Sequence, residues 1–199
     1  PDSLHLIAQV QNSKAMLGRR DHAGFLTTTF TDAGTDITLI NDKGYDACSY
    51  FFPDGKHLIW TSVRDKMGTS GKLEGDWSDW QHYPQGAELY ISDRQGGHVK
   101  RLTNNDYYEA EVTVSPDGKW IVFGRQIKGN MDLWVMNADG TGEHQITFTE
   151  DWQEGAPYFL PDSNTILFRA WKASEYGQRP TPMTIFTIKR DGSDLKTQT

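Results

Sequence analysis

Short runs of β-branched and aromatic residues alternate with polar turns along the whole chain. A Pro-Asp turn precedes such a run four times, at Pro1, Pro53, Pro116 and Pro161. Proline supplies the fixed φ of the turn, and the following aspartate can accept a hydrogen bond from the backbone. Short β-branched runs bounded by turns are typical of strands. Because no stretch keeps a hydrophobic period of about 3.6 residues, we predict almost no helix.

The turns mark a repeating unit. The four prolines lie 52, 63 and 45 residues apart, and one four-stranded propeller blade takes about 40–50 residues. Each unit reads as an inner strand, the Pro-Asp turn, a second strand, a variable loop, a third strand, a glycine turn and a short fourth strand. We therefore predict an all-β propeller of four-stranded antiparallel blades, with approximate blades 1–40, 41–103, 104–147 and 148–199.

The first unit lacks its inner strand. We therefore expect the four units to form an arc of a larger propeller of about six to eight blades. On this expectation they do not form a closed four-bladed ring.

Residues 109–147 carry the repeat most fully. An acidic residue stands six positions before Ser-Pro-Asp-Gly-Lys, and Asp-Leu-Trp-Val-Met-Asn-Ala-Asp-Gly follows, with Ile-Thr at the end. This pattern resembles the TolB-like, PD40 type of WD40-related β-propeller. Residues 46–103 carry it with an insertion, 154–195 with Ser163 in place of glycine, and 1–40 weakly.

The resemblance implies a non-enzymatic protein-binding or scaffolding propeller, periplasmic or otherwise outside the cytoplasm, whose partner is a protein. Two alternatives belong to other classes. Similar blades form the lid over the active site in prolyl-oligopeptidase-type serine peptidases, which would require a hydrolase domain C-terminal to this chain. A sugar-binding or lyase propeller would require clustered histidine and acidic ligands at the mouth of the channel.

Composition narrows the functions further. The formal net charge is −7, which argues against a nucleic-acid surface. No apolar run approaches the roughly 18–20 residues of a membrane span. The chain contains no Gly-x-Ser-x-Gly, no phosphate-binding loop, no calcium loop and no histidine pair at helical spacing. The sequence therefore predicts no catalytic residue, no cofactor and no metal-binding motif.

Three acidic residues occupy one position of the repeat. Asp46, Glu109 and Glu154 each lie seven residues before a repeat proline, so rotation about the propeller axis should place them in an arc at one height near the channel. One interpretation is a cation site, or an acidic mouth for a basic ligand or peptide. The other is structural: each carboxylate accepts backbone N–H groups or pairs with an arginine of the next blade, such as Arg64, Arg125 or Arg169.

The second unit contains a long insertion between its second and third strands, at residues 63–86. Loops longer than about 12–15 residues are uncommon and often functional. The insertion is rich in aromatic residues, which are enriched at interface hot spots. We expect either a partner-contact surface or rings that fold back over the blade's own loop end. The candidate contact residues are Asp76, Trp77, Asp79, Trp80, His82 and Tyr83.

Overall fold

The fold is a series of separate antiparallel sheets in chain order. The computed structural model describes residues 5–11, 25–32, 36–41, 46–66 and 79–198. Blade 1 holds β1 (His5–Gln11), β2 (Phe25–Asp32) and β3 (Asp36–Leu39). Blade 2 holds β4 (Asp46–Phe51), β5 (His57–Ser62), β6 (Glu88–Asp93) and β7 (Lys100–Arg101). Blade 3 holds β8 (Tyr108–Val114), β9 (Trp120–Ile127), β10 (Asn130–Asn137) and β11 (His144–Gln145). Blade 4 holds β12 (Trp152–Phe159), β13 (Thr165–Lys172), β14 (Thr184–Lys189) and β15 (Lys196–Thr197).

The all-β prediction is confirmed. The helical content of the described residues is one 3₁₀ turn, η1 (Ala173–Glu175), between β13 and β14. The fourth strands are shorter than the sequence predicts, with only two residues each in β7, β11 and β15. In each of these blades a residue with positive φ (His98, Gly142 or Asp194) follows the glycine turn by two positions. This left-handed residue interrupts the extended backbone, so pairing begins only after it.

The Pro-Asp turns have the hydrogen bonds that their sequence predicts. The Asp54 carboxylate accepts a bond of 2.8 Å from the backbone N–H of Lys56, and Asp162 accepts one of 2.8 Å from that of Thr165. The hydroxyl of Thr165 and the backbone N–H groups of Asn164 and Thr165 lower the pKa of Asp162, and the hydroxyl contributes most. The turns thus satisfy the backbone at the start of β5 and β13.

Hydrophobic side chains fill the spaces between neighbouring blades. Ile121 and Phe123 on β9 point toward blade 2, where they pack with Ile59 and Leu89. Val122, between them, points the other way and packs with Phe168 of blade 4 and its neighbours. The period of two along β9 therefore divides its side chains between two cores, and both faces of this sheet are buried.

Each inner strand bulges at the same place. The backbone register shifts within β4, β8 and β12. The residue with positive φ is Cys48, Glu111 or Ala156, and each lies five positions before its repeat proline. A bulge adds one unpaired residue and bends the strand. It therefore redirects the side chains of all three inner strands in the same way.

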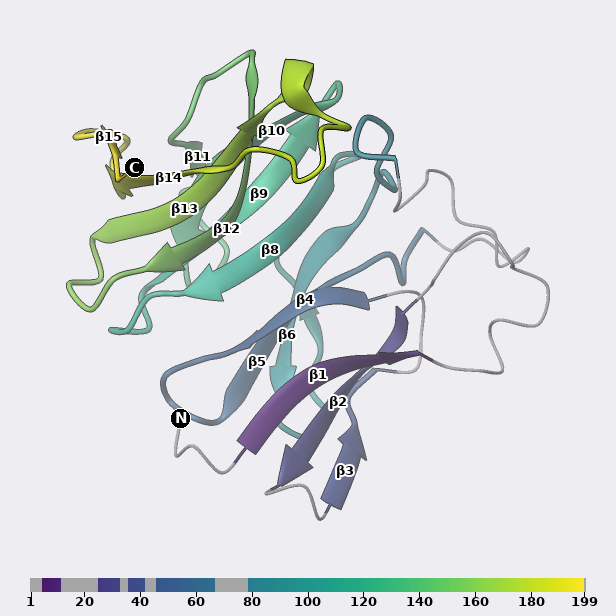
Figure 1. Ribbon diagram of the computed structural model, residues 1–199. Helices are drawn as coiled ribbons and strands as arrows, with labels where there is room; N and C mark the ends of the chain where they lie inside the picture. The colour runs from purple at the N-terminus through teal and green to yellow at the C-terminus, as the bar shows by residue number, and fades with distance from the viewer. Residues whose placement is uncertain (1–4, 12–24, 33–35, 42–45, 67–78, 199) are drawn as a thin grey trace.

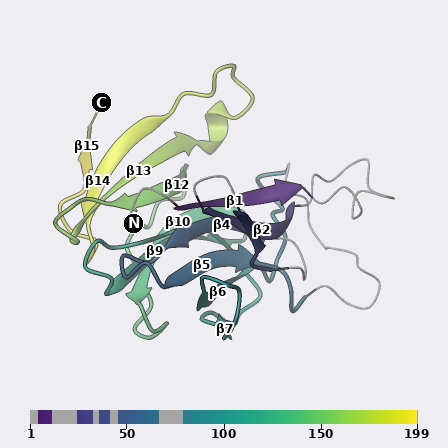
Figure 2. The same ribbon diagram turned by 90° about the horizontal axis from the view of Figure 1, so that it is seen from below.

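The blades form an open arc. Figure 1 shows the sheets fanned in order from β1–β3 to β12–β15, and Figure 2 shows β13 and β14 on the opposite side of the molecule from β6 and β7. Among the described strands, those of blade 1 pair with one another and those of blade 4 pair with one another, but none pairs between the two blades. This agrees with the expected arc.

A close backbone approach links consecutive blades at their glycine turns. A Cβ on Gly96 would lie 2.2 Å from the carbonyl oxygen of Ile40 in the preceding blade. The matching glycines Gly140 and Gly192 would each place a Cβ 3.2 Å from a carbonyl oxygen, of Leu102 and Ile146 respectively. All three have positive φ. The repeat thus needs glycine for its conformation and for the contact between blades.

We predict that Gly96→Ala destabilises the protein far more than Gly55→Ala. Both glycines have positive φ, but a Cβ on Gly55 meets nothing within 4 Å. The control therefore carries the conformational cost alone, about 1 kcal/mol. The Gly96 variant must also separate two blades, for a total of roughly 3 kcal/mol. Thermal unfolding of the two variants measures the difference, and equal midpoints would contradict the contact.

Candidate binding site at the loop end of the blades

The strand register places the three acidic residues at equivalent positions. Asp46 lies opposite Ser62, Glu109 opposite Arg125 and Glu154 opposite Ala170. All three side chains are buried. They come from the first half of each inner strand, before the bulge.

Each of these carboxylates accepts a hydrogen bond from the segment that links the preceding blade to its own. The Asn41 amide donates to both oxygens of Asp46, at 2.7 and 2.9 Å. The Asn105 amide donates to Glu109 at 2.8 Å, and the Thr149 hydroxyl donates to Glu154. The linker before blade 3 also holds an acid of the preceding blade, because the backbone N–H of Asn105 donates to Glu88 of blade 2 at 2.7 Å.

Of the three arginines named as candidate partners, Arg64 lies over the Tyr90 ring, with its guanidinium carbon 5.6 Å from the ring centre, and the other two form ion pairs. Arg125 pairs with Glu109, with its Nε 2.7 Å from the carboxylate, but it belongs to the same blade rather than a neighbouring one. Arg169 instead donates to Glu111 at 3.0 Å. Asp46, Glu109 and Glu154 therefore have the hydrogen bonds of the structural interpretation, given by linkers and by one arginine. Binding of a cation by the whole arc stays a prediction.

The pKa of Glu154 is raised to about 8. Burial is the main cause, the nearby Asp132 carboxylate adds to it, and the hydrogen bond from Thr149 opposes it. Burial also raises the pKa of Glu109, although Arg125 and Asn105 oppose the shift. Glu154 is thus protonated near neutral pH while lying 3% exposed beside two cavities.

The described part of the insertion packs against blades 3 and 4. The ring of Trp80 lies edge-on to Trp171, with centroids 4.9 Å apart, and 5.5 Å from Tyr176. The Gln126 amide donates to the Trp80 carbonyl. Trp80 thus crosses the short turn of blade 3 and reaches the loop that follows β13.

The other predicted contact residues lie beside Trp80 where the structure describes them. His82 is largely exposed, with its Nδ1 2.7 Å from the Asp79 carboxylate. Tyr83 packs on Tyr108, with centroids 4.6 Å apart. Asp76 and Trp77 lie outside the described residues.

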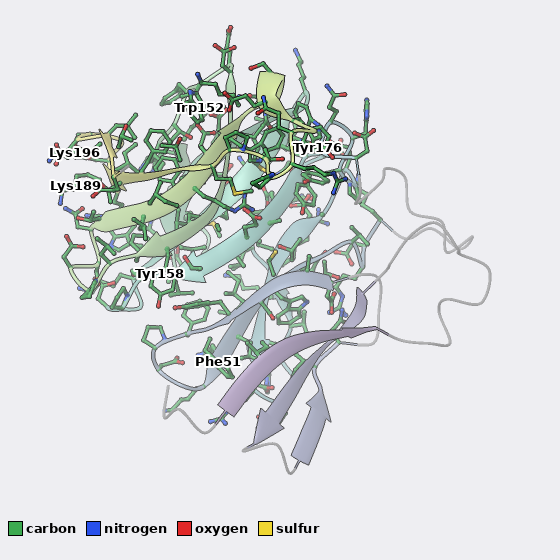
Figure 3. All side chains as sticks on the ribbon, in the orientation of Figure 1. Phe51, Trp152, Tyr158, Tyr176, Lys189 and Lys196 are labelled. Carbon is green, nitrogen blue, oxygen red and sulfur yellow. The ribbon has the colours of Figure 1, made fainter. Side chains whose placement is uncertain are left out.

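A cavity of about 80 Å³ opens beneath these rings. Trp80, Tyr83, Tyr108 and Trp171 form its aromatic walls, and Glu111, Arg169 and Glu154 are among its polar lining. Figure 3 shows Tyr176 at this upper end of blade 4, and Tyr158 at the other end of β12. The insertion and the inner strands therefore meet in one recessed, aromatic and charged site.

The sequence analysis did not select Glu111, Trp171 or Tyr176 as site residues, and it named Arg169 only as a possible partner of the repeated acids. Glu111 joins the site because the bulge redirects its side chain toward Arg169. Trp171 and Tyr176 lie in a modest insertion of blade 4, residues 171–182, at the same point of the repeat as the long insertion of blade 2. That shared position was the available signal that the two loops meet.

No three histidine, cysteine, aspartate or glutamate side chains in the described part of the chain are grouped so as to hold a metal ion. Among the same residues, no helix has the length and apolar character needed to cross a bilayer.

The sheets define the protein as a β-propeller, and its fold is that of solved TolB structures. Residues 44–161 match the family described as the dipeptidyl peptidase IV (DPP IV) N-terminal region, and the chain belongs to this family.

Comparison with individual proteins agrees on the fold. The chain is 26% identical over 222 residues to an uncharacterised protein of Agrobacterium fabrum, covering 99% of this chain and 73% of that protein. It is 37% identical over 65 residues to dipeptidyl-peptidase 5 of Porphyromonas gingivalis, covering 30% of this chain and 9% of that protein. The solved structure of a TolB homologue from Agrobacterium tumefaciens superposes with a TM-score of 0.70 at 19% identity, over 99% of this chain. This chain spans 61% of that structure's length.

We predict that Glu154→Gln flattens the dependence of stability on pH. The pKa of Glu154 is about 8 in the folded protein, against an ordinary value of 4.5. Its stabilising contribution is therefore full below about pH 4.5 and lost as pH rises to about 8. Glutamine cannot ionise, so the variant should lose less stability than wild type between pH 5 and pH 9. The difference between the two losses should exceed about 1 kcal/mol, or roughly 2–4 °C in Tm.

Thermal unfolding across this pH range checks the prediction. Glu150→Gln is the control, because it removes an exposed carboxylate from the same linker. Parallel pH curves for wild type and Glu154→Gln would contradict the prediction.

Proposed function

We propose that this propeller is a non-enzymatic binding module that captures a protein partner at its loop end. The observation that carries the proposal is the Trp80–Trp171–Tyr176 cluster, which joins loops of blades 2 and 4 across blade 3. Tryptophan and tyrosine supply large rigid contact areas and dominate interface hot spots. Tyr176 remains 54% exposed, so the cluster presents aromatic surface to solvent.

The polar groups around the cluster suit recognition of a peptide segment. Glu111 and Arg169 form an ion pair on the wall of the cavity, and each keeps part of its side chain accessible. Paired charges beside an aromatic recess can fix the register of a bound chain. The resemblance to TolB-like propellers supports the same use, and on that resemblance we place the protein outside the cytoplasm, as part of an extracytoplasmic complex.

A second candidate is the gating propeller of a prolyl-oligopeptidase-type serine peptidase. The match to the dipeptidyl peptidase IV N-terminal region favours it, as does the local likeness to dipeptidyl-peptidase 5 of Porphyromonas gingivalis. In that case the loop-end cavity would face a hydrolase domain and admit peptide substrates.

Replacing the aromatic side chains tests the binding proposal. Tyr176→Ala removes an exposed ring, so we expect Tm within about 1 °C of wild type and at least a tenfold loss of partner capture. Trp80→Ala should lose capture as well, with some loss of stability because Trp80 also packs on Trp171. Binding of the purified partner, measured by calorimetry, gives the affinities.

Tyr158→Ala is the matched control. Tyr158 is also a half-exposed tyrosine of blade 4 but lies at the opposite end of β12 (Figure 3). It should retain capture. Equal affinities for wild type and Tyr176→Ala, or equal losses in the Tyr176 and Tyr158 variants, would contradict a loop-end interface.

The full-length protein separates the two candidates. A gating propeller predicts hydrolysis of short peptides by the intact protein, abolished by a serine-directed covalent inhibitor. Our proposal predicts no release of amino acids or dipeptides at any substrate length, and inhibitor-sensitive hydrolysis would refute the non-enzymatic assignment.

A further inference from the structure

Blade 3 contains a buried arginine that fills the space beside its inner-strand acid. The Arg125 side chain is 3% exposed. Its guanidinium lies 4.3 Å from the centre of the Trp134 ring. Its Nε donates to Glu109 at 2.7 Å, and its Nη2 donates to Glu143 at 2.7 Å. One carboxylate, one aromatic face and a second carboxylate thus enclose this cation.

Blade 4 has the same frame without the arginine. The register puts Ala170 opposite Glu154, where blade 3 has Arg125 opposite Glu109. The position of Trp134 in the repeat is taken by Phe186, and that of Glu143 by Leu195. No lysine, arginine or histidine of the described residues forms an ion pair with Glu154, and its Oε2 has no hydrogen-bond partner.

The missing side chain leaves a cavity of about 280 Å³ between blades 3 and 4. Its lining is mainly apolar and aromatic, with Glu154 and Ala170 among the lining residues; the rings are those of Phe148, Trp152, Phe168 and Phe186. Pockets for drug-sized ligands have volumes of about 300–1,000 Å³. This cavity is slightly smaller, so it suits a single long side chain or a small organic ion.

The aromatic walls are arranged around this space. Trp152 meets Phe186 edge-on with centroids 5.4 Å apart, and Phe168 stacks on Phe186 at 5.4 Å. Figure 3 shows Trp152 at the upper end of β12, away from Lys189 and Lys196 at the hairpin edge. Phe148, at the mouth, is 76% exposed. The cavity therefore opens to solvent beside an exposed ring.

Aromatic faces around a carboxylate favour a cation. The negative faces of the rings attract positive charge, and the unpartnered Glu154 oxygen provides a charge-assisted acceptor. Burial raises the pKa of Glu154, so a guanidinium that pairs with this carboxylate would displace its proton to solvent. The Lys172 ammonium lies 5.3 Å from the centre of the Trp152 ring and would repel a bound cation. The formal net charge of the protein, −7, favours the approach of a cation.

We propose that this cavity binds the guanidinium group of an arginine side chain presented by a protein partner. The bound arginine would take the place in blade 4 that Arg125 takes in blade 3. Its guanidinium would donate to Glu154 and lie against Phe186, and its aliphatic stem would contact Leu195. A planar guanidinium matches a carboxylate beside a ring better than an ammonium does.

The proposal concerns a different surface from the loop-end cluster of Trp80, Trp171 and Tyr176. It rests on the proposed protein-binding function only for the source of the arginine. The Tyr176→Ala variant should therefore bind an arginine peptide as well as wild type does, which keeps the failure of one proposal distinguishable from the failure of the other.

Titration with short capped peptides tests the proposal. The probes are a peptide with one arginine, the same peptide with citrulline, which is a neutral isostere, and methylguanidinium alone. We expect the arginine peptide to bind at least tenfold more tightly than the citrulline peptide, with chemical-shift changes at Trp152 and Phe186. Equal affinity for the two peptides would refute recognition of the charge. Methylguanidinium binding as tightly as the arginine peptide would refute a protein-borne source.

Two variants localise the site. Glu154→Gln should weaken binding of the arginine peptide at least tenfold. Glu150→Gln, which removes an exposed carboxylate from the same linker, should leave this binding unchanged. Ala170→Arg should fill the cavity from within, as Arg125 fills the equivalent space in blade 3, and abolish peptide binding. Unchanged binding by Glu154→Gln, or by a folded Ala170→Arg protein, would overturn the assignment.

Discussion

The carboxylate at the start of each inner strand is the interaction on which the arrangement of the blades depends. A buried carboxylate must be hydrogen-bonded, or its burial costs several kcal/mol. In this protein the linker from the preceding blade supplies the donor, through Asn41, Asn105 or Thr149. Satisfying the acid therefore fixes where one blade ends relative to the next. The glycine contacts, such as Gly96 against the Ile40 carbonyl, fix the same relation at the outer edge.

Because these contacts recur in every described inner strand, residues at other positions of the repeat can differ between blades. Because the acid is held by the linker, the residue across the ladder can vary without loss of the fold, and it is Ser62 in blade 2, Arg125 in blade 3 and Ala170 in blade 4. Arginine closes the space beside the acid, and alanine leaves a cavity. The loops between second and third strands vary in the same way, and the two longer ones meet over the short one. Binding surfaces thus arise where blades differ, on a scaffold set by where they agree.

The three acids occupy equivalent positions of the repeat, but the charges and hydrogen-bond donors around them differ. Glu109 has Arg125 beside it, and both oxygens of Asp46 accept from the Asn41 amide. Glu154 accepts from the Thr149 hydroxyl and has the Asp132 carboxylate nearby. Burial raises its pKa to about 8, and Asp132 adds to the shift. The replacement of one neighbouring arginine by alanine therefore leaves an acid with a raised pKa, and the proposed arginine site is built on this acid.

The sequence by itself determined the repeat, the strand order and the equivalence of Asp46, Glu109 and Glu154, because turn chemistry and a period of two are local properties. It also located the long insertion of blade 2. Only the tertiary structure decided that Trp80 reaches Trp171 and Tyr176, because contacts between loops of different blades depend on how the sheets are rotated. The bulges at Cys48, Glu111 and Ala156 likewise left no turn residue in the sequence to mark them. The cavity beside Ala170 became visible only once the ladder set it opposite Glu154, since an absent side chain has meaning only in its three-dimensional place.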